Sequence, residues 1–380
     1  MRTVRDLPVE GARVLVRADL NVPLDGTRIA DDSRIRAALP TIRYLRERSA
    51  DVVVCSHLGR PNGAPDPALS LCPVAGRMSE LLGEPVAFGD ETGPLRLLEN
   101  LRFDPRETKN DPAMAAELAA LADFYVNDAF GSAHRAHAST EAVAHLLPCA
   151  AGLLLEAELN AFHRLLDSPA HPFVVVLGGV KVADKIGVID RFTQLADAIL
   201  IGGAMAFTFL AARGLDVGES RHEDEAGQET ARQAVADAAS RGCELVLPAD
   251  VVVADRFAAD ADVRTVAVEA IPAGWMGLDI GPETVAGYAA RLAGARTIFW
   301  NGPMGVFELA PFARGTVAVA EAVAASEAVS VVGGGDSVAA VNVAGVADRI
   351  THVSTGGGAA LELVEGRVLP GVAALEEAAA

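Results

Sequence analysis

The chain has 380 residues, of which 51% are hydrophobic, so it can bury the cores of two or three globular domains. It carries 32 Lys and Arg against 51 Asp and Glu, and the net charge of −19 argues against nucleic acid or an anionic membrane surface as a partner. The longest uncharged apolar stretch, Ala198–Ala212, is short for a membrane span. The first residues contain no apolar signal region, and the four cysteines show no CxxC spacing. We therefore expect a cytoplasmic protein with reduced thiols.

In chain order, the first half alternates apolar runs with helical patterns. Strands are predicted at residues 14–17, 52–55, 85–88, 95–98 and 123–127. Helices are predicted over about 33–48 with a bend at Pro40, and over 70–82, 111–121 and 153–166. We expect Asp32 or Ser33, Ser70 and Asp111 to cap the first three of them. The stretch after Leu166, DSPAHP, is the expected hinge and domain boundary.

The second half repeats this alternation with Ala-rich helices. Its predicted strands are residues 173–177, 197–201, 245–247, 251–254, 266–268, 296–300, 328–332 and 351–353. Strands that alternate with helices at this spacing indicate βαβ units and parallel sheets. The length fits two such sheets, one in each half, so the predicted fold class is α/β with two similar-sized, doubly wound domains.

The loops after the first-half strands are rich in arginine and histidine. They contain Asp19 and Asn21, His57 and Arg60, Arg102, and His134 with Arg135, while Arg34 opens a nearby helix. Because ligands of doubly wound folds bind beyond the carboxyl ends of the strands, these side chains are expected to converge. Guanidinium and imidazole groups together can hold a small ligand with several negative charges. Each arginine alone could equally be an ordinary surface residue.

The loops after the second-half strands contain glycines instead. These are Gly178-Gly179, Gly202-Gly203, Asn301-Gly302-Pro303, Gly333-Gly334-Gly335 before Asp336, and Gly356-Gly357-Gly358. Any one pair could be a helix cap or a tight turn, but five at successive strand ends favour a nucleotide, because glycine lets backbone N–H groups approach phosphates. Asp336 is the predicted carboxylate for Mg²⁺. Neither GxxxxGK[ST] nor GxGxxG occurs, which argues against a P-loop or an ordinary dinucleotide site.

Two of the chain's three lysines, Lys181 and Lys185, lie four residues apart after the strand at 173–177. The chain has 29 arginines, so this use of lysine is selective, and a compact point charge suits a moving phosphoryl oxygen. A solvated helix start is the alternative. Glu308 could accept from a ribose hydroxyl or be an ordinary surface carboxylate.

These motifs resemble the phosphoglycerate kinase family nearly end to end. They are RADLNVP, SHLGRP, LLENLRF, NDAFGSAHRAHAS, LGGVKVADKIG, IGGAMAFTF, PAGWMGLDIGP, WNGPMGVFE, GGGD and HVSTGGGAALELVEG. The resemblance implies reversible phosphoryl transfer between 1,3-bisphosphoglycerate and ADP, giving 3-phosphoglycerate and ATP, with Mg²⁺. It also implies a substrate-binding domain over 1–160, to which a tail over 366–380 returns, and a nucleotide-binding domain over 171–365, joined by a hinge helix. As partners it implies only these small molecules, and we expect a monomer.

The resemblance also implies roles for individual residues. Those expected to bind the phosphoglycerate are Asp19, Leu20, Asn21, Arg34, His57, Leu58, Gly59, Arg60, Arg102 and Arg135. Those expected to bind the nucleotide are Lys185, Gly203, Glu308, Gly334, Gly335, Asp336 and Ser337, with Asp336 on the metal. Those expected to meet the transferring phosphoryl group are Arg34, Lys181, Lys185, Gly357 and Gly358.

One connection departs from the family pattern. Only six residues, GDETGP, separate Phe88 from Leu95, whereas a parallel crossover needs about a dozen or more. We therefore expect that one short strand is missing here or that the pair is not parallel. The departure keeps two alternatives open: a divergent paralogue acting on a related carboxylate, and a catalytically silent binding protein. The intact Arg34, Lys181, Lys185 and Asp336 argue against the second.

Overall fold

The computed structural model describes residues 1–378 and forms two compact units. Unit 1 comprises Met1–Asn160 together with the segment from Arg367 onward, and unit 2 comprises Ala161–Gly366. Helix α4 (Leu153–Leu166) runs across the boundary between them in sequence. Within residues 1–378, no helix has both the length and the apolar character that a membrane span requires.

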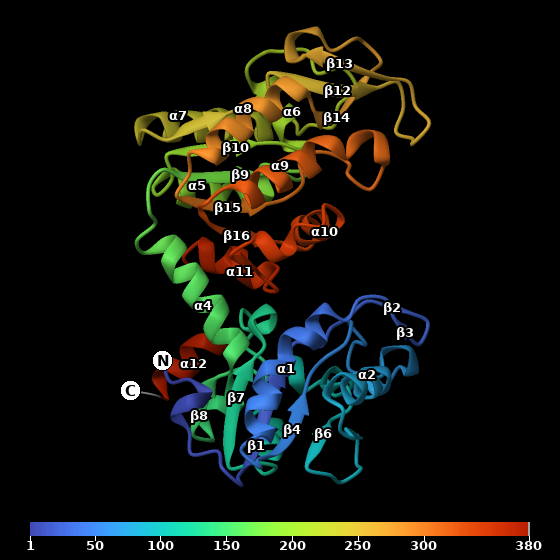
Figure 1. Cartoon of the computed structure of the whole chain (residues 1–380), viewed down its shortest axis with the longest axis vertical. Coiled ribbons are helices and arrows are strands. Elements are labelled where there is room, and N and C mark those ends of the chain that lie inside the picture. Colours follow the sequence, from blue (N-terminus) through green and yellow to red (C-terminus); the bar gives the residue numbers. More distant parts are fainter. Residues whose placement is uncertain (379–380) are drawn as a thin grey trace. The chain divides into compact units, whose positions relative to one another are not determined.

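Unit 1 is built on a six-stranded parallel sheet (Figure 1). Its strands, in spatial order, are β5 (Ala87–Phe88), β6 (Leu95–Leu97), β4 (Asp51–Cys55), β1 (Arg13–Ala18), β7 (Phe124–Asp128) and β8 (Cys149–Ala151). After β1 the chain forms β4, β5 and β6 on one side of β1, and it then crosses to form β7 on the other side. The carboxyl ends of β1, β4 and β7 therefore meet where the strand order reverses, which is where doubly wound folds bind ligands.

The helices of unit 1 cover both faces of this sheet. They are α1 (Ser33–Arg46), α2 (Cys72–Leu82), α3 (Pro112–Ala119) and α12 (Pro370–Glu377), and a short hairpin pairs β2 (Leu24–Asp25) with β3 (Arg28–Ile29). Alternate residues of β1, Val14 and Val16, are buried in the apolar core that includes Ile35 of α1. The residues between them point to the opposite face, so Arg17 faces away from this core. On the other side of the unit, α12 packs beside β8.

Two of the three predicted helix caps differ from the structure. Asp111 accepts hydrogen bonds from the backbone N–H groups of Ala113 and Met114, as predicted for a cap. Asp32 makes no capping bond, because its carboxylate is instead paired with Arg36 and Arg77. Helix α2 begins at Cys72 with Leu71 at the N-cap position, so Ser70 lies one residue before the cap. Its hydroxyl still accepts from the N–H of Cys72 at 3.2 Å, and it donates to a carboxylate oxygen of Glu99 at 2.7 Å.

The prediction for the short connection at residues 89–94 was wrong. Both strands are present, and β5 pairs parallel with β6, with Ala87 opposite Arg96 and Phe88 opposite Leu97. Because β5 has only two residues, the chain needs to travel back only about two residue lengths before β6 begins. Gly89, whose φ is 60°, begins the turn, and its N–H donates to Leu97 O at 2.9 Å, which ties the turn to the neighbouring strand.

Unit 2 contains a second six-stranded parallel sheet. Its strands, in spatial order, are β11 (Glu244–Val246), β10 (Ala198–Ile201), β9 (Phe173–Leu177), β15 (Thr297–Asn301), β16 (Val329–Gly333) and β17 (His352–Val353). The helices are α5 (Ile186–Thr193), α6 (Met205–Ala212), α7 (Glu225–Ser240), α8 (Pro282–Ala293), α9 (Arg314–Ala325), α10 (Gly335–Val343) and α11 (Gly358–Val364). The strand order reverses between β9 and β15. The two parallel sheets with flanking helices confirm the predicted fold class.

Unit 2 also has a small antiparallel sheet that the sequence reading overlooked. It joins β13 (Val263–Ala267), β12 (Asp250–Ala254) and β14 (Met276–Ile280). The predicted strands at 251–254 and 266–268 therefore do not belong to the parallel alternation that their spacing indicates, and β14 is a strand that the sequence pattern does not predict. The loops that join β12, β13 and β14 contain no α-helix, which is the signal for antiparallel pairing. An apolar cluster that includes Phe207, Val251 and Val253 packs this sheet against α6.

Short 3₁₀ turns complete the chain. They are η1 (Val4–Asp6), η2 (Pro67–Leu69), η3 (Leu101–Phe103), η4 (Glu107–Lys109), η5 (Phe130–Ser132), η6 (Ala142–His145), η7 (Ala183–Lys185), η8 (Val268–Ala270), η9 (Ala310–Phe312) and η10 (Ala347–Arg349).

Candidate active site

The loops after β1 and β4 are fastened to each other at the edge of the unit 1 sheet. The N–H of Leu20 donates to the Ser56 hydroxyl at 2.9 Å, and the N–H of Gly59 donates to Oδ1 of Asn21 at 2.9 Å. Leu20 and Leu58 are buried, so they anchor the two loops rather than face a ligand. These contacts hold the predicted residues Asp19 to Asn21 against His57 to Arg60.

Arg34, the second residue of α1, pairs with the buried carboxylate of Asp19. Its guanidinium is about one-third exposed, so the pair lies at the rim of the site with room for a further anion on the arginine. A bidentate guanidinium can hold a carboxylate on one edge and a phosphoryl oxygen on another.

His57 is buried among cationic groups. Burial lowers the pKa of His57 well below its usual value, and the charges of Arg17, Arg102, His137 and Arg34 lower it further. The ring is therefore neutral at physiological pH, and can accept at one nitrogen while it donates from the other.

Arg102 lies half-buried on η3, after β6. Its Nη1 donates to Gly59 O at 2.9 Å, while its buried Nε has no hydrogen-bond partner among the atoms of residues 1–378. Burial lowers the pKa of Arg102, as does the charge of Arg17, although an arginine remains protonated. An unsatisfied buried donor is costly unless a ligand completes it, so this group is suited to an anion.

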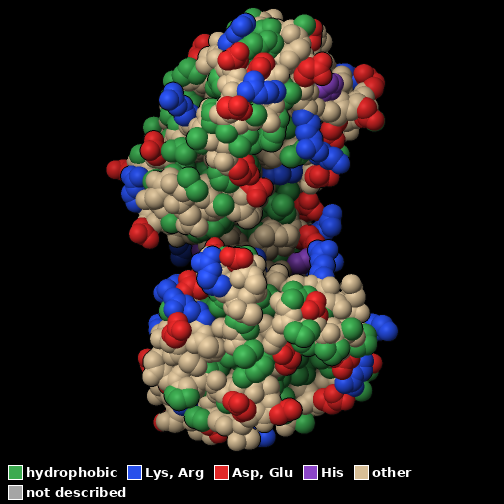
Figure 2. Space-filling model, turned by 90° about the vertical axis from the view of Figure 1, so that its right-hand side faces the viewer, with side chains coloured by type: hydrophobic (Ala, Val, Ile, Leu, Met, Phe, Trp, Pro, Cys, Tyr) green, Lys and Arg blue, Asp and Glu red, His purple; other side chains and the backbone are tan. Residues whose placement is uncertain are grey.

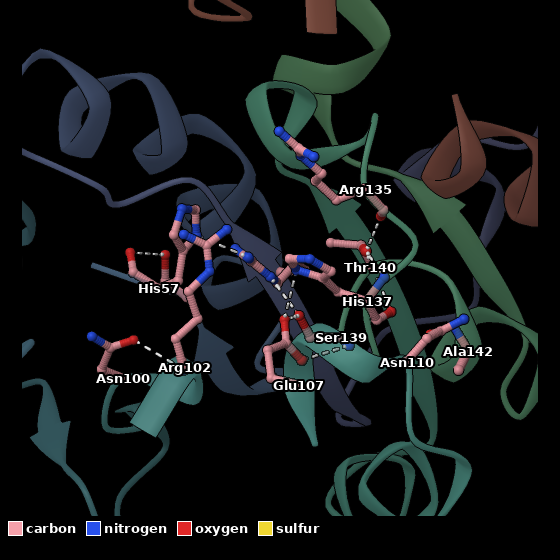
Figure 3. A network of polar contacts seen from close by, with 12 residues as sticks. His57, Asn100, Arg102, Glu107, Asn110, Arg135, His137, Ser139, Thr140 and Ala142 are labelled. Carbon is pink, nitrogen blue, oxygen red and sulfur yellow. Dashed lines mark hydrogen bonds and ion pairs between the residues drawn. The ribbon is translucent and has the colours of Figure 1, made fainter. Parts of the chain in front are cut away.

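Arg60 and Arg135 are exposed, and within residues 1–378 neither guanidinium makes a hydrogen bond or an ion pair. Arg60 is close enough for its charge to act on Arg102. The Arg135 side chain points away from Glu107 (Figure 3), and no contact joins it to the other predicted residues. Figure 2 shows several basic side chains and a histidine together at one end of unit 1.

A buried polar network that the sequence reading missed lies behind this site (Figure 3). It links Arg17 of β1 to Ser139, whose hydroxyl donates to Glu107 at 2.6 Å, and all three side chains are fully buried. Nδ1 of His137 lies 3.6 Å from the same Glu107 oxygen. Arg17 could have been suspected, because it is a charge inside an otherwise apolar strand. Glu107 gives no local signal.

In unit 2 the glycines after β9, β10 and β15 interlock. A Cβ on Gly178 would lie 1.9 Å from Pro303 O, and one on Gly302 would lie 2.3 Å from Gly178 O. Gly203 has φ of 68°, and a Cβ there would lie 2.6 Å from the amide nitrogen of Gly179. The three strand ends thus approach more closely than side chains would permit. Their glycines are required first for packing, a role that the sequence reading had not assigned to them.

Lys185 is bound at the junction between β9 and β15. Its Nζ donates to the backbone oxygen of Asn301 at 3.0 Å and also to the Asn301 side chain. Burial lowers the pKa of Lys185 to about 8, while the charge of Asp336 acts in the opposite direction. Lys181 is exposed and, in the part of the chain that the structure describes, has no hydrogen-bond or ion-pair partner.

A pocket of about 390 Å³ lies within unit 2 beside these residues. Three residues predicted from the sequence line it, namely Gly203, Glu308 and Asp336. The remaining walls are mainly apolar and were not predicted individually. They include Phe207, Val251, Phe257, Leu278 and Met304. A small ligand with a flat apolar part and a charged end fits such a lining.

Asp279 is a buried carboxyl in the wall of this pocket. Burial raises its pKa to about 7, although it accepts hydrogen bonds from the N–H groups of Gly315 at 2.7 Å and Ile280 at 2.9 Å. It fixes the first turn of α9 against β14. A carboxyl within the apolar strand MGLDI was the available signal for it.

The loops before α10 and α11 differ in how open they are. Gly334 has φ of 94°, and a Cβ there would lie 2.5 Å from Nδ2 of Asn301, whereas a Cβ on Gly335 or Gly357 would meet no atom within 4 Å. Gly358, the first residue of α11, is exposed. Ser337 is buried, and its Oγ accepts from the N–H of Gly302 at 2.6 Å, so this hydroxyl already supports the β15 loop.

Asp336 is exposed at the start of α10 and lines the pocket. Within residues 1–378, no group of three or more His, Cys, Asp or Glu side chains could enclose a metal ion. A single carboxylate suits Mg²⁺, which keeps several waters and binds mainly through the phosphates of a nucleotide.

The family of the chain follows from comparison with known proteins. The profile of the family "Phosphoglycerate kinase" matches residues 4–367. A phosphoglycerate kinase of Rubrobacter xylanophilus is 60% identical over 99% of this chain and 98% of its own length, and one of Chloroflexus aurantiacus is 57% identical over 99% of both. The solved phosphoglycerate kinases of Coxiella burnetii and Pyrococcus horikoshii superpose with TM-scores of 0.91 and 0.86, at 41% and 33% identity, over the whole of this chain and 99% of each of theirs. These likenesses favour neither a divergent paralogue nor a silent binding protein. The chain therefore belongs to the phosphoglycerate kinase family and is an enzyme of the kinase class.

Proposed function

We propose that this enzyme transfers a phosphoryl group reversibly between 1,3-bisphosphoglycerate and ADP, giving 3-phosphoglycerate and ATP. The acid binds to unit 1 and the nucleotide to unit 2. The observation that carries the proposal is the cationic cluster around His57, in which Arg60 and Arg102 make no ion pair within residues 1–378. The cluster is opposite in sign to the net charge of the chain. A small acid with a phosphate and a carboxylate matches such a cluster.

In unit 1, Arg60, Arg102 and Arg135 hold the phosphate and carboxylate of the acid, and His57 donates a hydrogen bond. The unpartnered Nε of Arg102 and the free guanidinium of Arg60 support these roles. Asn21 acts indirectly, since its side-chain oxygen is used to fasten Gly59. Asp19 orients Arg34, which reaches the transferring group.

In unit 2, the nucleotide base lies between the apolar walls of the pocket, and the phosphates extend toward Asp336. Gly203 and Glu308 contact the nucleoside, a role that their presence in the lining of the pocket supports. Asp336 binds the Mg²⁺ that accompanies the phosphates. The metal, when bound, neutralises phosphate charge. The open space at Gly335 supports an approach of phosphate oxygens to the backbone there.

The transfer itself needs positioning and positive charge more than it needs a nucleophilic side chain. An oxygen of the substrate carboxylate attacks the γ-phosphorus of ATP, the bond from that phosphorus to the bridging oxygen of ADP breaks, and ADP leaves with the electron pair. No proton is released. Arg34, Lys181 and Lys185 and the amides of Gly357 and Gly358 stabilise the charge on the equatorial oxygens. The two ligands must meet away from water, which would otherwise hydrolyse the nucleotide.

We also propose that the enzyme acts in the cytoplasm as a monomer and binds no nucleic acid. The four cysteines are free thiols, of which Cys55, Cys149 and Cys243 are buried, as suits a reducing compartment. The net charge of −19 repels a nucleic-acid backbone.

The test is a coupled assay of MgATP with 3-phosphoglycerate, run beside other phosphorylated or carboxylic acids. We expect turnover of 3-phosphoglycerate in preference to the others. Turnover of another carboxylate with none of 3-phosphoglycerate would support the paralogue, and calorimetric binding of both ligands without turnover of any acid would support a silent binding protein. Sedimentation velocity tests the monomer.

A further inference from the structure

The buried network behind the substrate site ends on one nitrogen of His57. Nη2 of Arg17 lies 3.0 Å from Nδ1 of His57, and Arg17 is fully buried. Arginine has only donors, because its guanidinium stays protonated in proteins. Nδ1 must therefore accept, and a neutral imidazole that accepts at Nδ1 carries its hydrogen on Nε2. The geometry of Arg17 thus selects one tautomer of the histidine.

The orientation of Arg17 depends in turn on Glu107. The Nε of Arg17 donates to the Ser139 hydroxyl at 2.8 Å, and that hydroxyl in turn donates a hydrogen bond to Glu107. The second oxygen of Glu107 accepts from the N–H of Ser139 at 3.1 Å. Figure 3 shows Glu107 and Ser139 turned toward each other in this arrangement. A guanidinium that is buried without a counter-charge is strongly unfavourable, and Glu107 supplies that charge through one hydroxyl.

We propose that Glu107 is a positioning residue for the reaction: through Ser139 and Arg17 it holds His57 as the neutral Nε2–H tautomer, so that Nε2 donates to an anionic oxygen of the acid substrate. This proposal rests on the proposed function only for the identity of that acid. It assigns a role to a carboxylate that itself contacts no ligand. It also explains why Arg17, Ser139 and Glu107 form a fully buried polar network next to a binding site.

The charges around both groups agree with this arrangement. Burial alone would raise the pKa of Glu107, but His137, Arg17 and Ser139 lower it, and the result lies below the usual value, so the carboxylate is ionised. His57 faces Arg17 of β1, Arg34 of α1, Arg102 of η3 and His137 of the loop after β7. All four groups disfavour the doubly protonated, cationic form of the imidazole, so His57 acts as a neutral donor.

The first measurement is the tautomer of His57 in the full-length enzyme without substrate. Long-range ¹H–¹⁵N correlation spectra of enzyme labelled at histidine distinguish protonated from unprotonated ring nitrogens, and the spectrum of His57→Gln identifies the signals. We expect an unprotonated Nδ1 and a protonated Nε2, unchanged between about pH 6 and pH 8. A protonated Nδ1, or a ring that titrates in this range, would overturn the proposal.

The second measurement compares Glu107→Gln, which keeps the shape and removes the charge, with Glu117→Gln as a matched control. Glu117 is an exposed glutamate that pairs with Arg106 on the surface. Glu107→Gln should raise KM for 3-phosphoglycerate by roughly 10-fold or more, the scale of one charge-assisted hydrogen bond, and should reduce the share of the Nε2–H tautomer. KM for MgATP should stay within about two-fold, as should every constant of Glu117→Gln.

A folded Glu107→Gln with unchanged tautomer and unchanged KM for the acid would refute a positioning role. If circular dichroism shows that this variant does not fold, Ser139→Ala replaces it, since it removes the bridging hydroxyl and leaves both charges. It should shift tautomer and KM in the same direction, and an unchanged result would again count against the proposal. An enzyme inactive on 3-phosphoglycerate would contradict the proposed function alone, because the tautomer is measured without substrate.

Discussion

Nucleotide binding should take up a proton at Lys185 when it is measured at alkaline pH. The Nζ of Lys185 is buried against Asn301, and burial lowers its pKa to about 8. A nucleotide phosphate beside this amine favours the charged form, so the pKa of Lys185 rises in the complex. Because the free enzyme has the lower pKa, binding is linked to proton uptake, and nucleotide affinity falls as the pH rises above 8.

The size of the effect follows from the two pKa values. We take about 8 for the free enzyme and assume that the complex returns to the ordinary value of 10.5. Linkage then gives an uptake of roughly 0.1 proton per nucleotide at pH 7 and about 0.9 at pH 9, and affinity about 10-fold weaker at pH 9 than at pH 7. Proton uptake on nucleotide binding is therefore nearly absent at pH 7 and close to one proton at pH 9.

Isothermal titration calorimetry with MgADP measures this uptake directly, since the observed enthalpy varies with the ionisation enthalpy of the buffer. Titrations at pH 9 in two buffers should differ by the amount that corresponds to one proton. Lys185→Met should remove the difference, while Lys109→Met, which removes an exposed lysine of unit 1, should leave it intact. Equal enthalpies in both buffers at pH 9, or an uptake that survives Lys185→Met, would refute the reasoning.

Three further predictions concern other parts of the molecule. Arg34→Ala should lower kcat by about 10²-fold with a modest rise in KM for the acid, because a contact made in the transition state is lost; steady-state kinetics that show the reverse pattern would make Arg34 a substrate-holding residue. Asp336→Ala should weaken MgATP binding much more than 3-phosphoglycerate binding in calorimetry, whereas equal losses would indicate a structural role. Burial raises the pKa of Asp128 to about 6, although hydrogen bonds from Thr41 and from the backbone of α4 act in the opposite direction. The protonated carboxyl therefore contributes stability at low pH, and this contribution is lost as the pH rises toward and through 6. Asp128→Asn should therefore raise the free energy of unfolding at pH 8 by up to about 3 kcal/mol in urea titrations, and a loss at that pH would contradict this account.

The parallel sheets could be predicted from the sequence because the strands are buried on both faces. Runs such as Phe173–Leu177 are continuous and rich in β-branched residues, and every residue of that strand is buried. The loops that follow such strands meet at one edge of the sheet, so the sequence alone predicts that their polar residues lie together. His57, Arg102 and Arg34 are indeed close enough for their charges to interact.

Pairings that depend on geometry at short range could not be predicted in this way. The direction of β5 against β6 was missed because the crossover rule assumes strands of ordinary length, and β5 has two residues. The link between Arg17 and Glu107 was missed because 90 residues of chain separate them and neither lies in a motif with the other. Asp32 was read as a helix cap, but Arg77, from a different helix, binds its carboxylate. For Arg17 and for Asp32, a partner that is distant in sequence decides the role of the residue.

The choice of lysine at position 185, in the nucleotide site that we propose, follows from burial. Lys185 lies in the glycine-packed junction of β9 and β15, where a permanent charge without a counter-ion would be costly until phosphate arrives. An amine can release its proton and so reduce that cost in the free enzyme, whereas a guanidinium cannot. Unit 1 follows the opposite rule. Its buried Arg17 remains charged at all times, and it therefore needs the permanent counter-charge of Glu107, which the chain supplies from another loop. The two buried cations thus differ in what balances their charge: Glu107 balances Arg17 through Ser139, whereas the phosphate that we propose balances Lys185.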